Sequence, residues 1–213
     1  MVWDRLLASQ FPFSWGEITM STQSVPRLTS QEYLAIERDL EQKHEFYRGE
    51  MFAMSGASIA HNIITVNLTA SLHAQLKDRD CNVFANDMRV QIQSTGLYTY
   101  PDAIVTCEQP QFEDDQFDTL LNPQVIFEVL SDSTEKYDRG KKFEHYRQIE
   151  SLQEYILIAQ DHPQIERFSR QQDRHWLLDE ASGLDAMLHL PTVDCTLNLA
   201  EVYAKVQFPQ AGK

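Results

Sequence analysis

Two short, almost continuous apolar segments constrain the fold of this chain most strongly. Val125-Ile126-Phe127 followed by Val129-Leu130 has the pattern of a strand buried on both faces of a sheet, and residues 155–159 repeat it. The residues between them, roughly 135–149, have the spacing of a helix. Strands of this kind need a covering layer on each face, so the pattern predicts a central sheet with helices packed on it.

Two further helices and several further strands are predicted in the rest of the chain. Thr29 and Glu32 form a capping-box pattern, which predicts a short helix ending near Leu40. A helix over residues 59–78 has two apolar faces, which predicts that both faces are covered. The strand signals, including a predicted hairpin around Asn86-Asp87, lie over residues 45–54, 82–85, 88–93, 99–106, 124–130, 166–169, 174–178 and 197–202.

This order of elements predicts an α/β (α+β) domain. It would have a mixed central β-sheet flanked by helices and an extra C-terminal β-hairpin. Residues 1–19 have no clear period, whereas Met20 precedes a polar stretch and a well-formed helix start. The sequence therefore predicts an N-terminal extension over 1–19 and a single domain over 20–213.

Charge and cysteine content exclude some classes of protein. The chain has 18 Lys and Arg against 32 Asp and Glu, a formal net charge of −14, which argues against a broad basic surface for nucleic acid and against an anchor on anionic membranes. It has no apolar run near the ~20 residues of a membrane span and no secretory signal. Its three cysteines are far apart and form no CxxC pair, so we expect reduced thiols in a cytoplasmic protein, with neither a zinc site nor a disulfide framework.

Three polar residues stand at positions where a purely structural chain would place other types. Asp102 follows Pro101 at the start of an apolar run, Glu128 interrupts the buried strand, and Lys142 lies in the helix after that strand. A carboxylate inside a buried strand costs several kcal/mol unless it is paired or binds a metal. Two such acids on neighbouring strands would repel each other, and a divalent cation removes that repulsion.

Helical geometry indicates which lysine faces these acids. At 100° per residue, Phe143, Tyr146 and Ile149 form an apolar stripe, and Lys142 lies within about 40° of its centre. Lys141 lies about 140° away and should be solvated. We therefore expect Lys142 to point toward Glu128, where its amine would position or deprotonate an attacking water or hold developing negative charge.

These residues resemble a known group of enzymes. Pro101-Asp102, Glu128 on an apolar strand and a following lysine resemble the PD-(D/E)xK restriction-endonuclease-like superfamily, except that the usual lysine position, two residues after the acid, is Leu130. EVLSDSTEKYDRGKKFEHYR is similar to a bacterial restriction-endonuclease-like family of unknown function, in which the lysine has moved to the following helix. HEFYRGEMFAMSGAS with His61 and Asn67, and SLQEYILI, extend the resemblance from Leu28 to the C-terminus.

The resemblance implies a Mg²⁺-dependent endonuclease, with Mn²⁺ as an alternative cation and nucleic acid, in the first place DNA, as the partner. It implies that Asp102 and Glu128 bind the metal, with the backbone carbonyl of Val129 as a third ligand and Lys142 as the catalytic lysine. A further acid often joins such sites. Glu50, in Arg48-Gly49-Glu50, is the first candidate, and Glu45 is the second.

Each of these residues also has a structural explanation. Glu128 would form a buried ion pair with Lys142 or Arg139, and Asp102 would be a turn residue at the start of a strand. Lys142 would extend along the core with its amine in water, and Glu50 would be a plain turn carboxylate.

His61 and Asp138 also have structural explanations. His61, on an apolar face of the long helix, fits a satisfied core or interface histidine. If it acts in the site, it would orient a phosphate or a carboxylate. Asp138 would pair with Lys142 four residues later.

Two further functions stay open on the sequence. One is a catalytically weak or inactive nuclease fold that serves as a nucleic-acid- or protein-binding module. The other is an interaction protein whose acidic surface suits a basic partner. The second apolar face of the long helix suits a homodimer.

Overall fold

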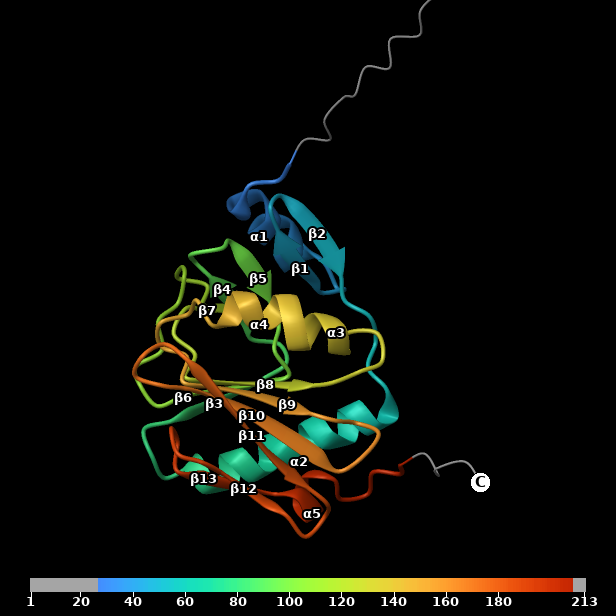
Figure 1. Ribbon diagram of the computed structural model, residues 1–213. Helices are drawn as coiled ribbons and strands as arrows, with labels where there is room; N and C mark the ends of the chain where they lie inside the picture. The colour runs from blue at the N-terminus through green and yellow to red at the C-terminus, as the bar shows by residue number, and fades with distance from the viewer. Residues whose placement is uncertain (1–26, 209–213) are drawn as a thin grey trace, which may run out of the picture.

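A computed structural model describes residues 27–208, and its centre is a six-stranded sheet (Figure 1). Strands β8 and β9 are parallel, and the other neighbours are antiparallel. In spatial order the strands are β11 (Trp176–Ser182), β10 (Gln164–Arg170), β9 (Glu154–Ile158), β8 (Val125–Val129), β6 (Ala103–Thr106) and β3 (Asn82–Ala85).

A second, five-stranded sheet and a separate hairpin complete the β-structure. The five strands are, in spatial order, β2 (Glu50–Ala53), β1 (His44–Tyr47), β5 (Leu97–Thr99), β4 (Arg89–Ile92) and β7 (Thr119–Leu120). The hairpin consists of β12 (Met187–Leu190) and β13 (Cys195–Asn198).

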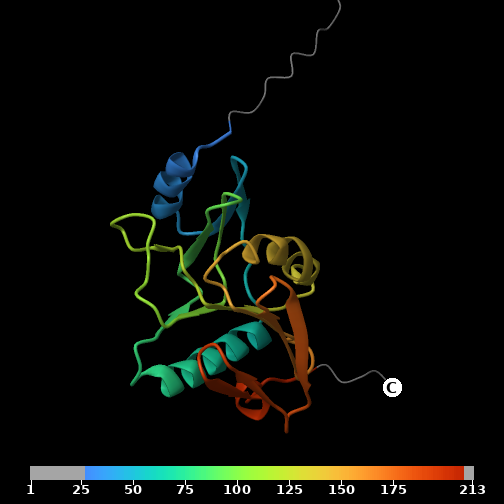
Figure 2. The same ribbon diagram turned by 60° about the vertical axis from the view of Figure 1, so that its left-hand side comes forward.

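Helices cover both faces of the six-stranded sheet, and a further helix, residues 30–39, packs on the five-stranded sheet (Figures 1 and 2). A helical segment between β8 and β9 consists of α3, a π-helical turn and α4. The helices are α1 (Ser30–Asp39), α2 (Ile59–Leu76), α3 (Glu135–Tyr137), the π turn (Asp138–Lys142), α4 (Phe143–Tyr146) and α5 (Leu199–Val202).

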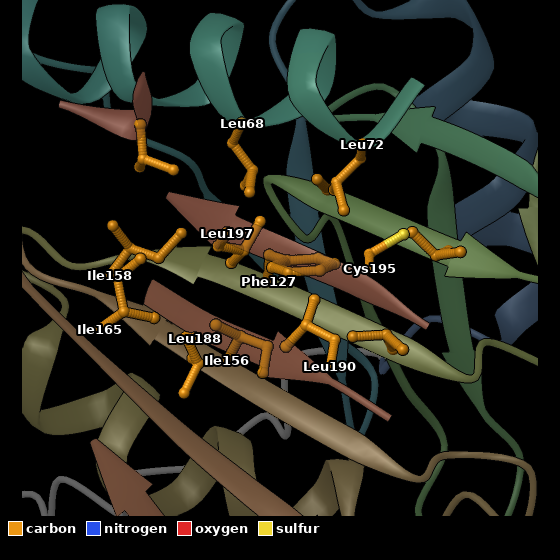
Figure 3. Close-up of a cluster of buried hydrophobic side chains, with 14 of the residues drawn as sticks. Leu68, Leu72, Phe127, Ile156, Ile158, Ile165, Leu188, Leu190, Cys195 and Leu197 are labelled. Atoms are coloured by element: carbon orange, nitrogen blue, oxygen red, sulfur yellow. The ribbon is translucent and has the colours of Figure 1, made fainter. Parts of the chain in front are cut away.

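Alternation along β8 divides the core into two layers. Val125, Phe127 and Val129 join the core formed with α2, β12, β13 and α5, part of which Figure 3 shows. Ile126 joins the core on the opposite face, which includes Tyr146 of α4. Because successive side chains of a strand point to opposite faces, Glu128 lies on the α3–α4 side together with Ile126.

The predicted fold class is confirmed. The structure has mixed sheets flanked by helices, and the C-terminal hairpin is present as β12–β13. The capping box of Thr29 and Glu32 begins α1 as expected. The predicted extension, residues 1–19, lies outside the described residues, so the division at residue 20 stays a prediction.

The predicted hairpin around Asn86-Asp87 is wrong. Strand β3 pairs with β6 in the six-stranded sheet, whereas β4 pairs with β5 and β7 in the other sheet. The turn therefore passes the chain from one sheet to the other. The single strand predicted over 99–106 is likewise divided into β5 and β6 at Pro101, which has no N–H to donate to a ladder.

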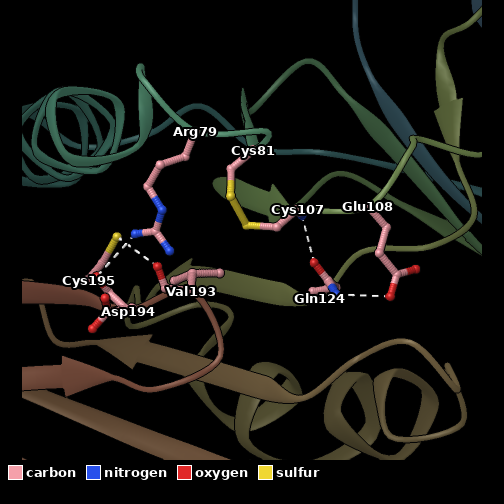
Figure 4. The surroundings of a disulfide bond; sticks show 8 residues. All are labelled: Arg79, Cys81, Cys107, Glu108, Gln124, Val193, Asp194 and Cys195. Atoms are coloured by element: carbon pink, nitrogen blue, oxygen red, sulfur yellow. Dashed lines mark hydrogen bonds between the residues drawn. A yellow bond between two sulfur atoms is a disulfide. The ribbon is translucent and has the colours of Figure 1, made fainter.

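The expectation of reduced thiols without a disulfide is also wrong for two of the three cysteines. Cys81 and Cys107 form a disulfide (Figure 4), and Cys195 is free and buried. The antiparallel register of β3 and β6 pairs Asn82 with Thr106, so Cys81 and Cys107 are the next opposed pair beyond the ladder. Their separation of 26 residues hid this proximity in the sequence.

Helix α2 is covered on only one of its two apolar faces within residues 27–208. Ile64 and Leu68 are fully buried, whereas Ile59 is 82% exposed and Val66 is 66% exposed. The homodimer suggested by this second face stays a prediction. No helix in the described part of the chain is long and apolar enough to cross a membrane.

We predict that the disulfide stabilises the fold. A Cys81→Ser/Cys107→Ser double variant should lose about 2–4 kcal/mol of unfolding free energy in urea, because the bridge restricts the unfolded chain. A thiol reductant should lower the stability of the wild-type protein to the same level and leave the double variant unchanged. Wild-type stability that does not respond to reductant would contradict this prediction.

Candidate active site

A cleft of about 870 Å³ contains most of the residues singled out in the sequence. Residues of β1 and β2, the start of α2, the end of β8 and the α3–α4 segment line it. Asp102, Glu128, Val129 and Lys142 all lie in its wall, whereas Glu50 does not.

Glu128 is the buried acid of this cleft, with 4% of its surface exposed. Its Oε1 accepts a hydrogen bond from the Tyr146 hydroxyl at 2.8 Å and lies 2.8 Å from the Lys142 Nζ. Both partners come from the helical segment that follows β8, so the chain supplies the acid and its partners within about one βα unit.

Lys142 is surrounded by carboxylates. Besides Glu128, its Nζ lies 3.4 Å from Asp138 Oδ1 and 3.6 Å from Glu45 Oε1, and the residue is only 5% exposed. Asp138 and Lys142 are the two ends of the π turn, a feature that is frequent at functional sites. Lys141 instead lies at the surface and pairs with Glu144, as expected.

Asp102 is held at the cleft by two nitrogens. Its Oδ2 accepts a hydrogen bond from the backbone N–H of Val129 at 2.7 Å and lies 3.2 Å from Nε2 of His61. Ser58 caps α2 by accepting from the His61 N–H, which fixes the start of the helix that presents the imidazole. His61 thus contacts the carboxylate of Asp102, the arrangement expected if it orients a carboxylate of the site.

The electrostatics of this cluster are unbalanced. Glu45, Asp102, Glu128 and Asp138 line the same cleft as Lys142, and the other lysine of its lining, Lys43, pairs with Asp87. Burial raises the pKa of Glu128 well above its usual range, and Asp138 and Asp102 add to that shift while Lys142 opposes it. Burial alone would lower the pKa of Lys142, but Glu128, Glu45 and Asp138 outweigh it and raise that pKa well above its usual range. Lys142 therefore stays charged at neutral pH.

Glu45 occupies the position for which Glu50 was the first candidate. Both belong to the β1–β2 hairpin, but Glu50 pairs with Tyr47 beside the turn and is exposed. Glu45 lies two residues farther from the turn, where its Oε1 accepts a hydrogen bond from Thr99 and faces Lys142. The sequence analysis ranked Glu50 first and Glu45 second, but only Glu45 lines the cleft.

The donor set fits a hard divalent cation. Within residues 27–208, no three His, Cys, Asp or Glu side chains are arranged to hold a metal on their own. In the same range, Val129 and His61 contact Oδ2 of Asp102, and its Oδ1 has no hydrogen-bond partner. Tyr146 and Lys142 contact Oε1 of Glu128, and its Oε2 likewise has none. Mg²⁺ is typically held by one or two carboxylates, with water and substrate phosphate completing its shell.

A comparison with known protein families identifies the family of this chain. Residues 30–200 match the model of the Uma2 family, described as "Putative restriction endonuclease". The chain belongs to this family.

The chain is also similar to proteins of known sequence and to a solved structure. Two uncharacterized proteins of Synechocystis sp. are similar: sll1609 at 42% identity over 75% of this chain and 90% of its own length, and slr1290 at 34% over 86% and 95%. A crystal structure titled as a putative nuclease belonging to DUF820, from Anabaena variabilis, matches with a TM-score of 0.69. It covers 84% of this chain and 99% of that protein at 18% identity, which shows a shared fold.

Some members of the site were not chosen from the sequence. Asp138 was assigned only a structural pairing with Lys142, and Tyr146 was counted as core. Both lie on the sheet-facing side of the same helical segment as Lys142. Their position on that side of the helix could have indicated from the sequence that they lie near Glu128. The π turn itself has no recognisable sequence pattern here.

We predict that Lys142 is essential for stability as well as for the site. Lys142→Met should lower the unfolding free energy by about 3–5 kcal/mol, because it leaves buried carboxylates without their cation. Lys141→Met, a matched change at an exposed position, should alter it by less than about 0.5 kcal/mol. Chemical denaturation in the presence of EDTA measures both, and equal effects of the two variants would contradict the assignment.

Proposed function

We propose that this protein is a Mg²⁺-dependent endonuclease that hydrolyses phosphodiester bonds of DNA. The observation that supports this most strongly is the convergence of Asp102, Glu128 and Lys142 in one cleft, with more negative charge than Lys142 can neutralise. A divalent cation would offset part of this negative charge and would offer a binding position to a phosphate.

In this proposal the cation is held by the two carboxylate oxygens that no protein group occupies. These are Oδ1 of Asp102 and Oε2 of Glu128, and the backbone carbonyl of Val129 adds a third oxygen. When bound, Mg²⁺ would polarise the scissile phosphate and favour in-line attack by water. His61 and the Val129 N–H contact Asp102 through its Oδ2, so Oδ1 would be available to a cation.

Lys142 acts in this proposal as a fixed positive charge. Because its pKa is raised by the surrounding carboxylates, it does not serve as a proton acceptor at neutral pH. Its ammonium orients Glu128 and stabilises the negative charge that develops on the phosphate during attack. This selects one of the roles that the sequence left open for the lysine.

The overall acidity of the chain restricts how DNA is held. A net charge of −14 opposes a broad electrostatic grip, so contact should be confined to the cleft and weaken strongly with salt. The loop before β7 is acidic, with Glu108, Glu113, Asp114, Asp115 and Asp118. Its charge is partly neutralised, because Arg38 pairs with Asp114 and Asp118 and Arg89 also pairs with Asp118.

Cleavage assays test this proposal. With Mg²⁺ or Mn²⁺, the wild-type protein should cleave plasmid DNA, single-stranded DNA or both, and EDTA should abolish the activity. Glu128→Gln, which keeps the shape of the side chain, should reduce the rate at least about 100-fold, since it removes a ligand oxygen's charge.

A matched control is available on the β1–β2 hairpin. Glu50→Gln makes the same chemical change outside the cleft and should leave the rate unchanged, whereas Glu45→Gln should lower it. Circular dichroism confirms that each variant is folded. Cleavage that is unaffected by Glu128→Gln, or that persists in EDTA, would contradict the proposal. An RNA substrate cleaved in preference to DNA would contradict the proposed substrate.

A further inference from the structure

One aromatic side chain of the cleft is half exposed and lies outside the buried cores. Phe52 of β2 is 49% exposed and lines the cleft. It belongs to none of the three buried cores and stacks on no other aromatic ring among residues 27–208. Strand β2 is the edge of its sheet, so no further strand of the described chain covers it.

The register of the hairpin directs Phe52 toward the carboxylates. Phe52 pairs directly with Glu45 across β1 and β2, and directly opposed residues of antiparallel strands project from the same face with Cβ atoms about 5 Å apart. Glu45 reaches within 3.6 Å of Lys142 on that face. The free ring of Phe52 is therefore next to the proposed reaction centre.

The rest of the cleft has few positively charged side chains and several side-chain amides. Of its described lining residues, only Lys43 and Lys142 are lysines and none is an arginine. Lys142 is committed to three carboxylates, and Lys43 pairs with Asp87. Four side-chain amides line the same cleft, from Gln42, Asn62, Asn86 and Gln160. Gln42 and Asn62 each donate to a backbone carbonyl and Gln160 accepts from Ser58, which leaves the other amide atom of each for a ligand.

This lining suits unpaired bases better than a duplex. A duplex presents mainly phosphates to a protein, and affinity for it depends on many Lys and Arg contacts that this cleft lacks. An unpaired base offers a face that stacks on an aromatic ring and edges that bond to amides, and both are hidden within a base-paired stack.

We propose that the cleft binds an unpaired segment of DNA, with a base stacked on Phe52 beside the scissile phosphate. This inference rests on the proposed nuclease function and specifies its substrate as single-stranded or locally unpaired DNA. Phe52 is then a substrate-binding residue, and the amides around it contact base edges.

Binding measured apart from cleavage tests the inference. A fluorescent oligonucleotide of about ten nucleotides is titrated in Ca²⁺, which occupies oxygen sites, and a gel verifies that the oligonucleotide stays intact. The wild-type protein should bind the unpaired strand more tightly than the same sequence as a duplex. Phe52→Ala should weaken binding of the unpaired strand about tenfold, since stacking on one base accounts for that much. Phe52→Trp should retain the affinity.

A second variant shows whether the loss of binding is specific to the ring in the cleft or follows from removing any exposed aromatic ring. Phe117 is 62% exposed on the loop before β7 and does not line the cleft, so Phe117→Ala should bind as the wild-type protein does. A 2-aminopurine base in the oligonucleotide should be quenched by the wild-type protein and not by Phe52→Ala. Equal binding by Phe52→Ala and wild type, equal binding of duplex and unpaired strand, or no binding of the unpaired strand would overturn the inference.

The outcome is independent of the proposed hydrolysis. Mg²⁺-dependent cleavage of duplex DNA that does not depend on Phe52 would keep the nuclease function and overturn this inference. Phe52-dependent binding of unpaired DNA without cleavage in Mg²⁺ would keep the inference about the bound strand and overturn the nuclease function.

Discussion

The buried ion pair between Glu128 and Lys142 is the interaction on which the arrangement of the site depends. A carboxylate in a central strand is tolerated only when its charge is compensated, and here the helix that follows the strand supplies the compensation. The α3–α4 segment is held on the sheet both by this pair and by the core packing of Tyr146 and Ile149. The π turn carries Asp138 and Lys142 at its two ends. The pair thereby connects the core of the six-stranded sheet with the cleft at the end of β8.

The same pair leaves a surplus of negative charge that stability alone does not require. A structural ion pair needs one acid and one base, whereas Lys142 meets three carboxylates and Asp102 lies in the same cleft. Burial and neighbouring like charges raise the free energy of the ionised cluster and with it the pKa of Glu128, and the ammonium of Lys142 alone does not offset the charge of all these carboxylates. A bound cation would offset more of it, which is why we interpret the cluster as a cation site and not as part of the scaffold.

Much of the fold and part of the site could be predicted from the sequence. The apolar strands and Lys142 were placed correctly because hydrophobic periodicity reports local burial directly. Strand pairing was less accessible: the chain continues from β3 into another sheet at Asn86-Asp87, and nothing local distinguishes that turn from a hairpin. Contacts that depend on register were missed for the same reason. Cys81 and Cys107 meet only through the β3–β6 ladder, and Glu45 displaces Glu50 only through the geometry of its hairpin.

The claim that the carboxylate cluster is a cation site is tested most directly by calorimetric titration of the metal-free protein with Mn²⁺. We expect the wild-type protein to bind one ion per cleft. Asp102→Asn and Glu128→Gln should each abolish that binding, and Glu50→Gln, outside the cleft, should retain it. Wild-type protein that binds no Mn²⁺, or binding that survives both substitutions, would contradict the account.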